Sequence, residues 1–124
     1  PNKQFIDQYL EGWRVGDGAM IHRATAEGFT YDDPNTGIIP RSGFIEFFDD
    51  FKQAAADLKG VPVTEPFLDY RDMVMDKSAP VWTVWCWWHA VGTDFQGSAV
   101  IKVGEDGVQS EQIAYYTKLP DQTP

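Results

Sequence analysis

The first residues of the chain carry a hydrophobic pattern with the period of an α-helix. Phe5, Tyr9 and Trp13 recur every four residues, and Ile6 and Leu10 lie beside them on the same helical stripe. We therefore expect a first helix whose buried side is largely aromatic.

Two residues mark the end of this helix and the start of a second, shorter one. Gly16 is a typical C-terminal cap because glycine readily adopts the left-handed conformation, and Asp17 is a typical N-cap. The second helix is predicted to continue through Met20, Ile21 and Ala24.

A strand, a loop and a third helix are expected next. Gly28 is predicted to lead into a strand over residues 29–33, which Pro34 ends. The following segment is predicted to be a loop, marked by Asn35, Thr36, Gly37 and Pro40. Ser42 is expected to cap the third helix and Gly60 to close it. The buried side of that helix is expected to contain Phe44, Phe47, Phe48, Phe51, Ala55 and Leu58.

Alternating hydrophobic positions predict strands throughout the second half. We place them at residues 62–76, 80–92, 95–104 and 107–119, with turns at 77–78, 92–94 and 104–107. Helices followed by a long antiparallel sheet predict the α+β class, with residues 1–124 in a single domain. A strongly curved antiparallel sheet wrapped around three N-terminal helices would enclose a conical, aromatic pocket.

The segment VWTVWCWWHAV, residues 81–91, is apolar on both alternating faces of its strand. The set expected to face the helices is Trp82, Val84, Cys86, Trp88 and Ala90. The opposite set is Val81, Thr83, Trp85, Trp87 and His89. A strand that is apolar on both faces needs a cover on each side. We therefore predict a homodimer that joins two copies through Val81, Trp85, Trp87 and His89.

Composition narrows the range of partners. The net charge of −9 argues against nucleic acids and anionic membranes as partners, and no apolar run is long enough to cross a membrane. The first residues show no signal-peptide pattern, and the single cysteine permits no internal disulfide, so we expect a cytoplasmic protein. With two widely separated histidines, we predict neither a metal site nor a cofactor.

Two adjacent acids close the first predicted strand. Alternation places Asp33 on one face with Phe29 and Tyr31, and Asp32 on the other face with Thr30. An aspartate that loses water on an apolar face becomes a stronger base near neutral pH. Asp33 is therefore a candidate general base. The alternative is an Asp-Asp-Pro turn in which both carboxylates are solvated.

Two segments resemble a known family. The stretches YLEGWRVGD at residues 9–17 and FTYDDPNTGIIPRSG at residues 29–43 resemble the N-terminal half of the ketosteroid isomerases. Those enzymes belong to the nuclear transport factor 2-like superfamily, together with the SnoaL-like polyketide cyclases. The resemblance implies a cystatin-like conical fold and catalysis without a cofactor. It implies that Asp33 is the base that moves a proton next to a carbonyl, and that Tyr9 donates a hydrogen bond to the enolate oxygen.

The chain departs from that family at one position of the site. The second oxyanion donor of ketosteroid isomerase is a protonated aspartate, and its place falls near Ala99. No carboxylic acid lies between Gly97 and Val103. Glu111, on the same side of the last strand as the apolar Ile113, is a candidate to replace the missing acid or to bind a polar group of the substrate. A solvated glutamate is the alternative.

Further residues are expected to line a pocket for a small hydrophobic ring compound. The substrate-binding candidates are Trp13, Tyr31, Phe51, Trp82, Cys86, Trp88, Glu111, Ile113 and Tyr115. Tyr9 and Trp13 have a simpler alternative role as packed core residues. Arg41 is expected to anchor the loop before the third helix, and His89 to face outward with Trp85 and Trp87.

Two functional hypotheses follow from these patterns. In the first, the protein is an isomerase, cyclase or lyase that acts on a small carbonyl compound with Asp33 and Tyr9. In the second, it is a non-catalytic domain of the same fold that binds a small molecule or serves as a dimeric adaptor. The missing acid near Ala99 favours the second hypothesis, and the match at Asp33 and Tyr9 favours the first.

Overall fold

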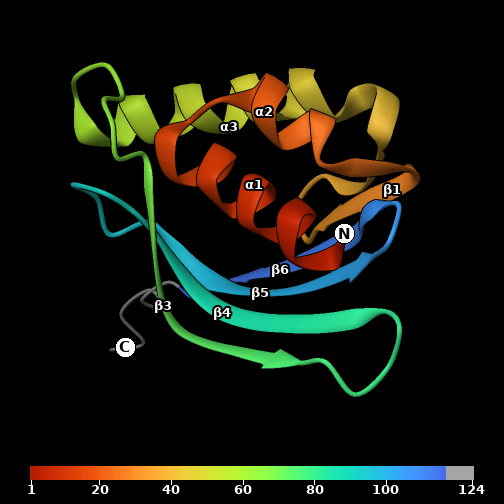
Figure 1. The fold of residues 1–124 in the computed structure, drawn as a ribbon. Helices are drawn as coiled ribbons and strands as arrows, with labels where there is room; N and C mark the ends of the chain where they lie inside the picture. Colours follow the sequence, from red (N-terminus) through yellow and green to blue (C-terminus); the bar gives the residue numbers. More distant parts are fainter. Residues whose placement is uncertain (117–124) are drawn as a thin grey trace, which may run out of the picture.

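Three helices lie on one side of a curved, six-stranded sheet in the computed structural model, which describes residues 1–116 (Figure 1). The predicted α+β class is thereby confirmed. In chain order the elements are α1 (Asn2–Val15), α2 (Gly18–Arg23), β1 (Thr25–Asp33), β2 (Gly37–Pro40), a 3-10 turn (Arg41–Gly43), α3 (Phe44–Lys59), β3 (Leu68–Asp76), β4 (Trp82–Ala90), β5 (Gln96–Gly104) and β6 (Gly107–Tyr115).

The helix ends follow the capping residues that the sequence predicts. Gly16 closes α1 with a left-handed backbone, at φ 76°, and Gly60 closes α3 in the same way, at φ 82°. Asp17 caps α2 because its carboxylate accepts a hydrogen bond from the backbone N–H of Met20 at 3.1 Å.

Two expectations about α3 are wrong. Ser42 does not cap the helix, because the chain first makes a 3-10 turn over Arg41–Gly43 and Gly43 occupies the N-cap position. Leu58 is 65 % exposed, because it lies in the last turn of the helix, where no described element covers it. The rest of the predicted stripe lies toward the core, with Phe47 partly buried and with Phe44, Phe48, Phe51 and Ala55 buried.

The first strand begins earlier than predicted, and the expected loop after it is a strand. β1 starts at Thr25, where it pairs with Val108 of β6, and Gly28 lies inside an irregular part of that pairing. Residues Gly37–Pro40 turn back as β2 and pair antiparallel with the end of β1. The backbone hydrogen bonds of this short hairpin override the loop signals of its proline and glycine.

The strand order β2-β1-β6-β5-β4-β3 corrects the expectation of a fully antiparallel sheet. Four neighbouring pairs are antiparallel, but β1 and β6 run parallel, with Tyr31 opposite Glu111. Helix α3 and four other strands separate β1 from β6 in the sequence, so that no tight turn forces them to run in opposite directions. This parallel pair brings the first and last strands together in the middle of the sheet.

The edge strand β3 begins at Leu68, six residues later than predicted, because residues 62–67 form no strand. Its pairing with β4 is irregular between Arg71 and Val74, and Asp72 has a positive φ of 54°. The other strand bounds shift by a few residues. The end of the predicted last strand, residues 117–119, lies outside the described residues.

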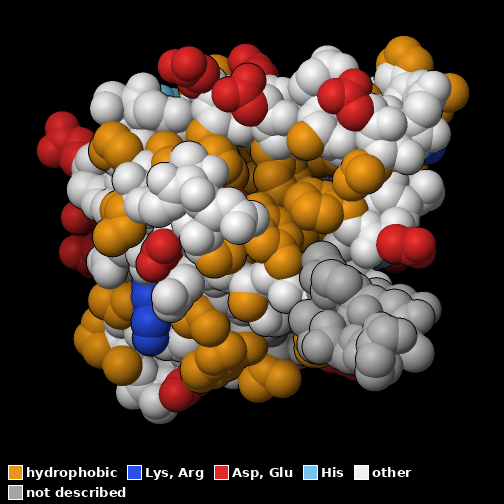
Figure 2. Space-filling model, turned by 180° about the vertical axis from the view of Figure 1, so that it is seen from behind, with side chains coloured by type: hydrophobic (Ala, Val, Ile, Leu, Met, Phe, Trp, Pro, Cys, Tyr) orange, Lys and Arg blue, Asp and Glu red, His pale blue; other side chains and the backbone are white. Residues whose placement is uncertain are grey.

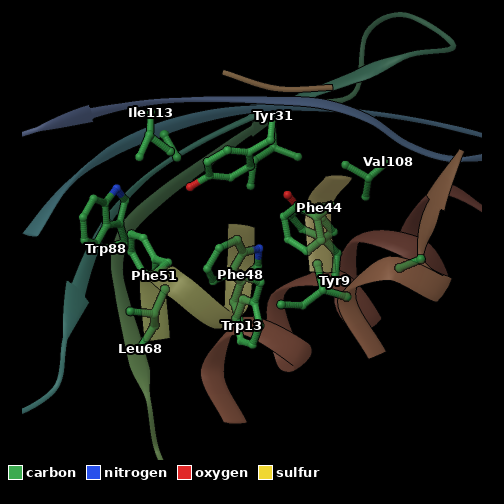
Figure 3. Packing of buried hydrophobic residues seen from close by; sticks show 14 of the residues in the cluster. Tyr9, Trp13, Tyr31, Phe44, Phe48, Phe51, Leu68, Trp88, Val108 and Ile113 are labelled. Carbon is green, nitrogen blue, oxygen red and sulfur yellow. The ribbon is translucent and has the colours of Figure 1, made fainter. Parts of the chain in front are cut away.

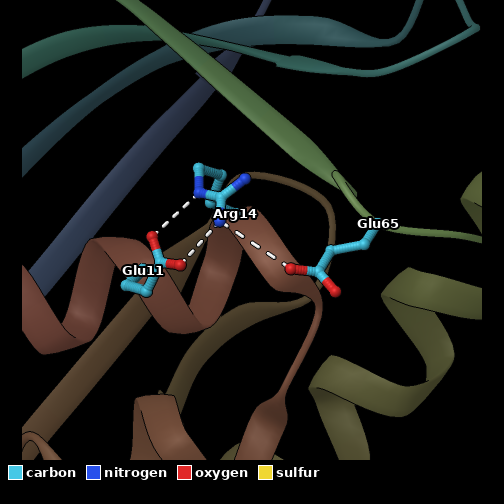
Figure 4. A network of polar contacts seen from close by, with 3 residues as sticks. All are labelled: Glu11, Arg14 and Glu65. Carbon is cyan, nitrogen blue, oxygen red and sulfur yellow. Dashed lines mark hydrogen bonds and ion pairs between the residues drawn. The ribbon is translucent and has the colours of Figure 1, made fainter.

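Polar contacts fix the segment that leads into β3 (Figure 4). The Arg14 guanidinium donates to both carboxylate oxygens of Glu11, at 2.8 and 2.6 Å, and lies 3.8 Å from the carboxylate of Glu65. The hydrogen bond from Arg14 lowers the pKa of Glu11. The backbone N–H of Phe67 also donates to the carbonyl of Arg14, at 2.6 Å. These contacts hold the start of β3 against the end of α1.

The two faces of β4 differ in burial as predicted. Val84, Cys86, Trp88 and Ala90 are buried against the helices, whereas Trp85 is 41 % exposed on the opposite face. Trp87 and His89 are half-buried there. Hydrophobic side chains also remain visible on the back of the molecule, where they gather below a row of acidic residues (Figure 2).

Candidate functional site

A small cavity lies between the helices and the sheet. Its volume is about 10 Å³, which is room for a single water molecule. Six of its seven lining residues are hydrophobic or aromatic, and the rings among them pack side by side in Figure 3. The lining residues are Trp13, Tyr31, Phe51, Leu68, Tyr70, Trp88 and Glu111.

Two larger grooves lie on the surface. One, of about 580 Å³, follows the C-terminal half of α3 from Asp49 to Val63, and the other, of about 640 Å³, adjoins Pro1, Trp82 and Asp106. No ionisable side chain that lines either groove is buried. The small cavity is the better candidate site because a buried acid opens onto it.

A hydrogen bond between Tyr9 and Glu111 lies beside the cavity. The Tyr9 hydroxyl on α1 donates to Oε1 of Glu111 on β6 at 2.5 Å. Tyr9 is 0 % exposed and Glu111 is 4 % exposed. The parallel pairing of β1 and β6 places Glu111 directly beside Tyr31. The alternative of a solvated Glu111 is therefore wrong.

Burial changes the acidity of this pair. Loss of hydration raises the pKa of Glu111 to about 7, and the hydrogen bond from Tyr9 opposes that rise. Burial and the nearby Glu111 also raise the pKa values of Tyr9, Tyr31 and Tyr70. Near neutral pH the tyrosines are therefore neutral donors, and Glu111 exchanges its proton readily.

Asp33 lies on the apolar face of β1, as alternation predicts, and is 2 % exposed. Its Oδ1 atom accepts hydrogen bonds from the backbone N–H groups of Asn35, at 2.8 Å, and Thr36, at 3.0 Å. Its Oδ2 atom accepts a hydrogen bond from the Tyr115 hydroxyl. The alternative of a turn in which both carboxylates are solvated is therefore wrong for Asp33, although Asp33 does organise the turn after β1.

Trp13 forms the centre of the aromatic packing around the cavity. Its ring stacks on Tyr31, with centroids 5.8 Å apart, and meets Phe48 edge-on at 5.3 Å. Trp13 is 2 % exposed. Within residues 1–116, its indole Nε1 is the one buried side-chain polar atom that has no hydrogen-bond partner.

The structure brings together most, but not all, of the predicted pocket residues. Trp13, Tyr31, Phe51, Trp88 and Glu111 line the cavity, and Tyr9 lies next to them. Four others lie elsewhere. Cys86 and Ile113 are buried on the inner sheet face outside the cavity lining, Tyr115 binds Asp33, and Trp82 lines the surface groove near Pro1, with Lys77 over its ring.

Two lining residues were missed by sequence reasoning. Leu68 and Tyr70 come from β3, the edge strand whose start was predicted too early. Their positions alternate with the exposed Asp69, and Tyr70 pairs with Trp88 of β4. That alternation was the available signal. Arg41 anchors its turn as expected, because it donates to Thr25 Oγ1 at 2.8 Å and to the carbonyl of His22 at 3.2 Å.

A metal cluster and a membrane-spanning helix, two other kinds of site, each require a particular pattern of residues. Across residues 1–116, no three His, Cys, Asp or Glu side chains are grouped so that they could hold a metal ion. In the same part of the chain, no helix is long and apolar enough to span a membrane. The outward-facing His89 lies away from the cavity, and its Nε2 lies 2.6 Å from the carbonyl oxygen of Thr93.

Comparison with known proteins identifies the fold. No family model and no curated protein matches the chain. Among solved structures, a candidate polyketide cyclase from Xanthomonas campestris pv. campestris is similar at 17 % identity and a TM-score of 0.61, covering 93 % of this chain and 90 % of that one. A candidate ketosteroid isomerase from Kribbella flavida is similar at 14 % identity and a TM-score of 0.60, covering 99 % and 83 %.

A third similar structure is a nuclear transport factor 2-like protein of unknown function from Cytophaga hutchinsonii. It shares 9 % identity at a TM-score of 0.62, covering 94 % of this chain and 90 % of that one. The protein therefore has the nuclear transport factor 2-like fold, a cone of helices and curved sheet. The resemblance seen in its sequence is confirmed at the level of the fold.

Proposed function

We propose that the protein is a cofactor-free enzyme that moves a proton at a carbon next to the carbonyl group of a small hydrophobic ring compound. Asp33 is the general base, and Tyr9 is the hydrogen-bond donor to the oxygen that becomes negative. The reaction is an isomerisation, a cyclisation or an elimination. Fold similarity alone does not define an activity, so that the proposal depends on the site.

The observation that carries the proposal is the buried Tyr9–Glu111 hydrogen bond. Ketosteroid isomerase is a precedent for this chemistry, because it uses a tyrosine and a protonated carboxylic acid as the two hydrogen-bond donors to the oxyanion. In this chain the position expected for the acid is Ala99, which has no carboxyl group. Glu111 instead supplies a buried carboxyl group beside Tyr9. With a pKa of about 7, Glu111 holds a proton part of the time near neutral pH, and for both groups to donate to the substrate oxygen the Tyr9 hydroxyl must turn from Glu111 toward it.

The two carboxyl groups of the proposed site face the same side of the sheet from adjacent strands. Asp33 and Glu111 lie on the inner faces of adjacent strands, and Asp33 is one inward-facing position beyond Tyr31, the neighbour of Glu111. Sheet geometry separates such diagonal positions by roughly 7 Å. In the proposed step, Asp33 takes a proton from the carbon while electrons move to the carbonyl oxygen, and Asp33 then returns the proton to the same or another carbon.

The Asp33→Asn variant is expected to lose proton-transfer activity by about 100-fold or more, because an amide cannot accept the proton. The measurement is deuterium uptake at the α-carbons of small cyclic ketones in heavy water, followed by proton NMR. Asp32→Asn is the matched control, because Asp32 points away from the core and is half-buried. Equal uptake by the Asp33→Asn variant and the unmodified protein would remove Asp33 from the mechanism.

The alternative function is binding without chemistry, and the missing acid near Ala99 favours it. Either function requires the cavity to open. A space of about 10 Å³ holds no ring compound unless the surrounding side chains move. Absence of deuterium uptake in the unmodified protein, combined with saturable binding of the same ketones, would support this alternative.

We also propose that two copies associate through the outer sheet face. Trp85 is 41 % exposed and Val81 is 37 % exposed, while Trp87 lies between them and His89 on the same strand face. Val74, opposite Trp85 on β3, is 59 % exposed and extends the apolar surface. Only the part of each ring that is still exposed can be buried on association, so these side chains would form the centre of the contact and residues around them would supply the rest of the area that a stable dimer needs.

The Trp85→Glu variant is expected to be monomeric at micromolar concentration, because the charge would be buried in the interface. Light scattering coupled to size-exclusion chromatography would measure the mass of the variant and of the unmodified protein. Leu58→Glu, at a similarly exposed apolar position on α3, is the control and should leave the dimer intact. A monomeric unmodified protein would contradict the proposal.

A further inference from the structure

The indole N–H of Trp13 is a buried donor without an acceptor. Trp13 is 2 % exposed and lines the cavity, and no hydrogen-bond partner for Nε1 lies among the described residues. A buried donor that gives up water without gaining a partner destabilises the fold, so that such groups need an explanation. A phenylalanine at this position would also be apolar and aromatic, and it would bury no unpaired N–H group.

The polar groups of Tyr9 and Glu111, beside the cavity, already form a hydrogen bond with each other. The Tyr9 hydroxyl donates a hydrogen bond to Oε1 of Glu111 and therefore faces the carboxyl group. Burial is the largest cause of the raised pKa of Tyr9, and the neighbouring Trp13 N–H opposes that rise. The Trp13 N–H is thus directed toward the Tyr9 hydroxyl, but no hydrogen bond of normal geometry joins the two groups.

The size of the cavity matches the missing acceptor. A volume of about 10 Å³ accommodates one oxygen atom with its immediate surroundings and no more. Water could supply that oxygen, and so could the carbonyl or hydroxyl group of a ligand. A water oxygen and a ligand oxygen would each accept the hydrogen bond from the Trp13 N–H in the same way.

We infer that Trp13 is a ligand-binding residue, whose indole N–H donates a hydrogen bond to an oxygen of the molecule held between Tyr9, Glu111 and the aromatic lining. The choice of a carbonyl oxygen as acceptor rests on the proposed function. The site then selects oxygen-bearing ring compounds over hydrocarbons of the same shape, because a hydrocarbon leaves the indole N–H unpaired. The ring itself requires the lining to move. Tyr70 alone among the seven lining residues is half-buried, which places access beside the edge strand β3.

The test is a titration of the ¹⁵N-labelled full chain with cyclohexanone, followed through the indole N–H signals of its tryptophans. Trp13→Phe assigns the signal of interest by its disappearance. We expect the Trp13 signal to shift in a saturable way, and the Trp13→Phe variant to bind cyclohexanone about 10-fold more weakly. Trp88→Phe is the matched control, because Trp88 lines the same cavity but its N–H already donates to the carbonyl of Ser98 at 3.2 Å. It should not show this loss.

Three results would overturn the inference. One is a titration in which other signals shift and that of Trp13 does not. Another is a contact between the Trp13 N–H and a bound water that persists at saturation, which would assign the cavity to water. The last is a spectrum that cyclohexanone leaves unchanged. Deuterium uptake from heavy water by the unmodified protein separates the two proposals, because binding of cyclohexanone through Trp13 without any uptake would support this inference and contradict the proposed enzyme.

Discussion

Replacing Glu111 with glutamine is expected to remove a pH dependence of about 3 kcal/mol from the free energy of unfolding. The pKa of Glu111 is about 7 in the folded protein, against an ordinary value of 4.5. The folded state therefore holds this proton between pH 4.5 and 7, where the unfolded chain releases it. Stability from this group is complete below pH 4.5 and is lost as the pH rises through 7.

The measurement compares urea unfolding of the two proteins at pH 4 and pH 8. The unmodified protein should lose about 3 kcal/mol more than the variant between these values, since all other titrating groups are shared. Glutamine keeps an oxygen that can accept from Tyr9, so that the variant should also be the more stable protein at pH 8. Glu105→Gln, an exposed position in the turn before β6, is the control. Parallel pH curves for both proteins would show that Glu111 is not desolvated.

Replacing Gly97 with alanine is expected to destabilise the protein by at least about 3 kcal/mol. A Cβ atom at this position would lie 1.9 Å from the backbone oxygen of Ala114 and 2.7 Å from the Trp88 ring. The first of these contacts involves the backbone of β6, which no rotamer change can move. Thermal unfolding by circular dichroism measures the effect.

The matched control for this change is Gly28→Ala. Gly28 also lies in a strand, but a Cβ atom there would meet nothing within 4 Å. This variant should keep its stability within about 0.5 kcal/mol. If both variants unfold at the same temperature as the unmodified protein, Gly97 does not provide the space in which Trp88 packs against the sheet.

The side of each element could be predicted from the sequence because side-chain direction follows a fixed period. The period of the first helix placed Tyr9 and Trp13 in the core, and alternation placed Asp33 and Glu111 on inner faces. Alternation does not report how far along the sheet the core extends. For that reason Trp82, at the first position of β4, was predicted in the pocket and instead lines a surface groove.

Other features depend on contacts that no local pattern records. The parallel pairing of β1 with β6 joins strands from opposite ends of the chain, and β2 exists because β1 offers it an edge. The volume of the cavity depends on the rotamers of large rings, which pack closely enough to leave about 10 Å³. The sequence therefore predicted a pocket where the structure shows an almost filled aromatic core.

The central position of β6 also has a consequence for how the protein folds. The hydrogen bond between Tyr9 and Glu111 spans 102 residues, so that nearly the whole chain must be ordered before the candidate site exists. Until β6 inserts, β1 and β5 both present open edges to other chains, and such edges promote aggregation. During synthesis β6 also leaves the ribosome after the five other strands of the sheet. The late insertion of β6, which completes the candidate site, thus also leaves the edges of β1 and β5 unpaired until that strand is made.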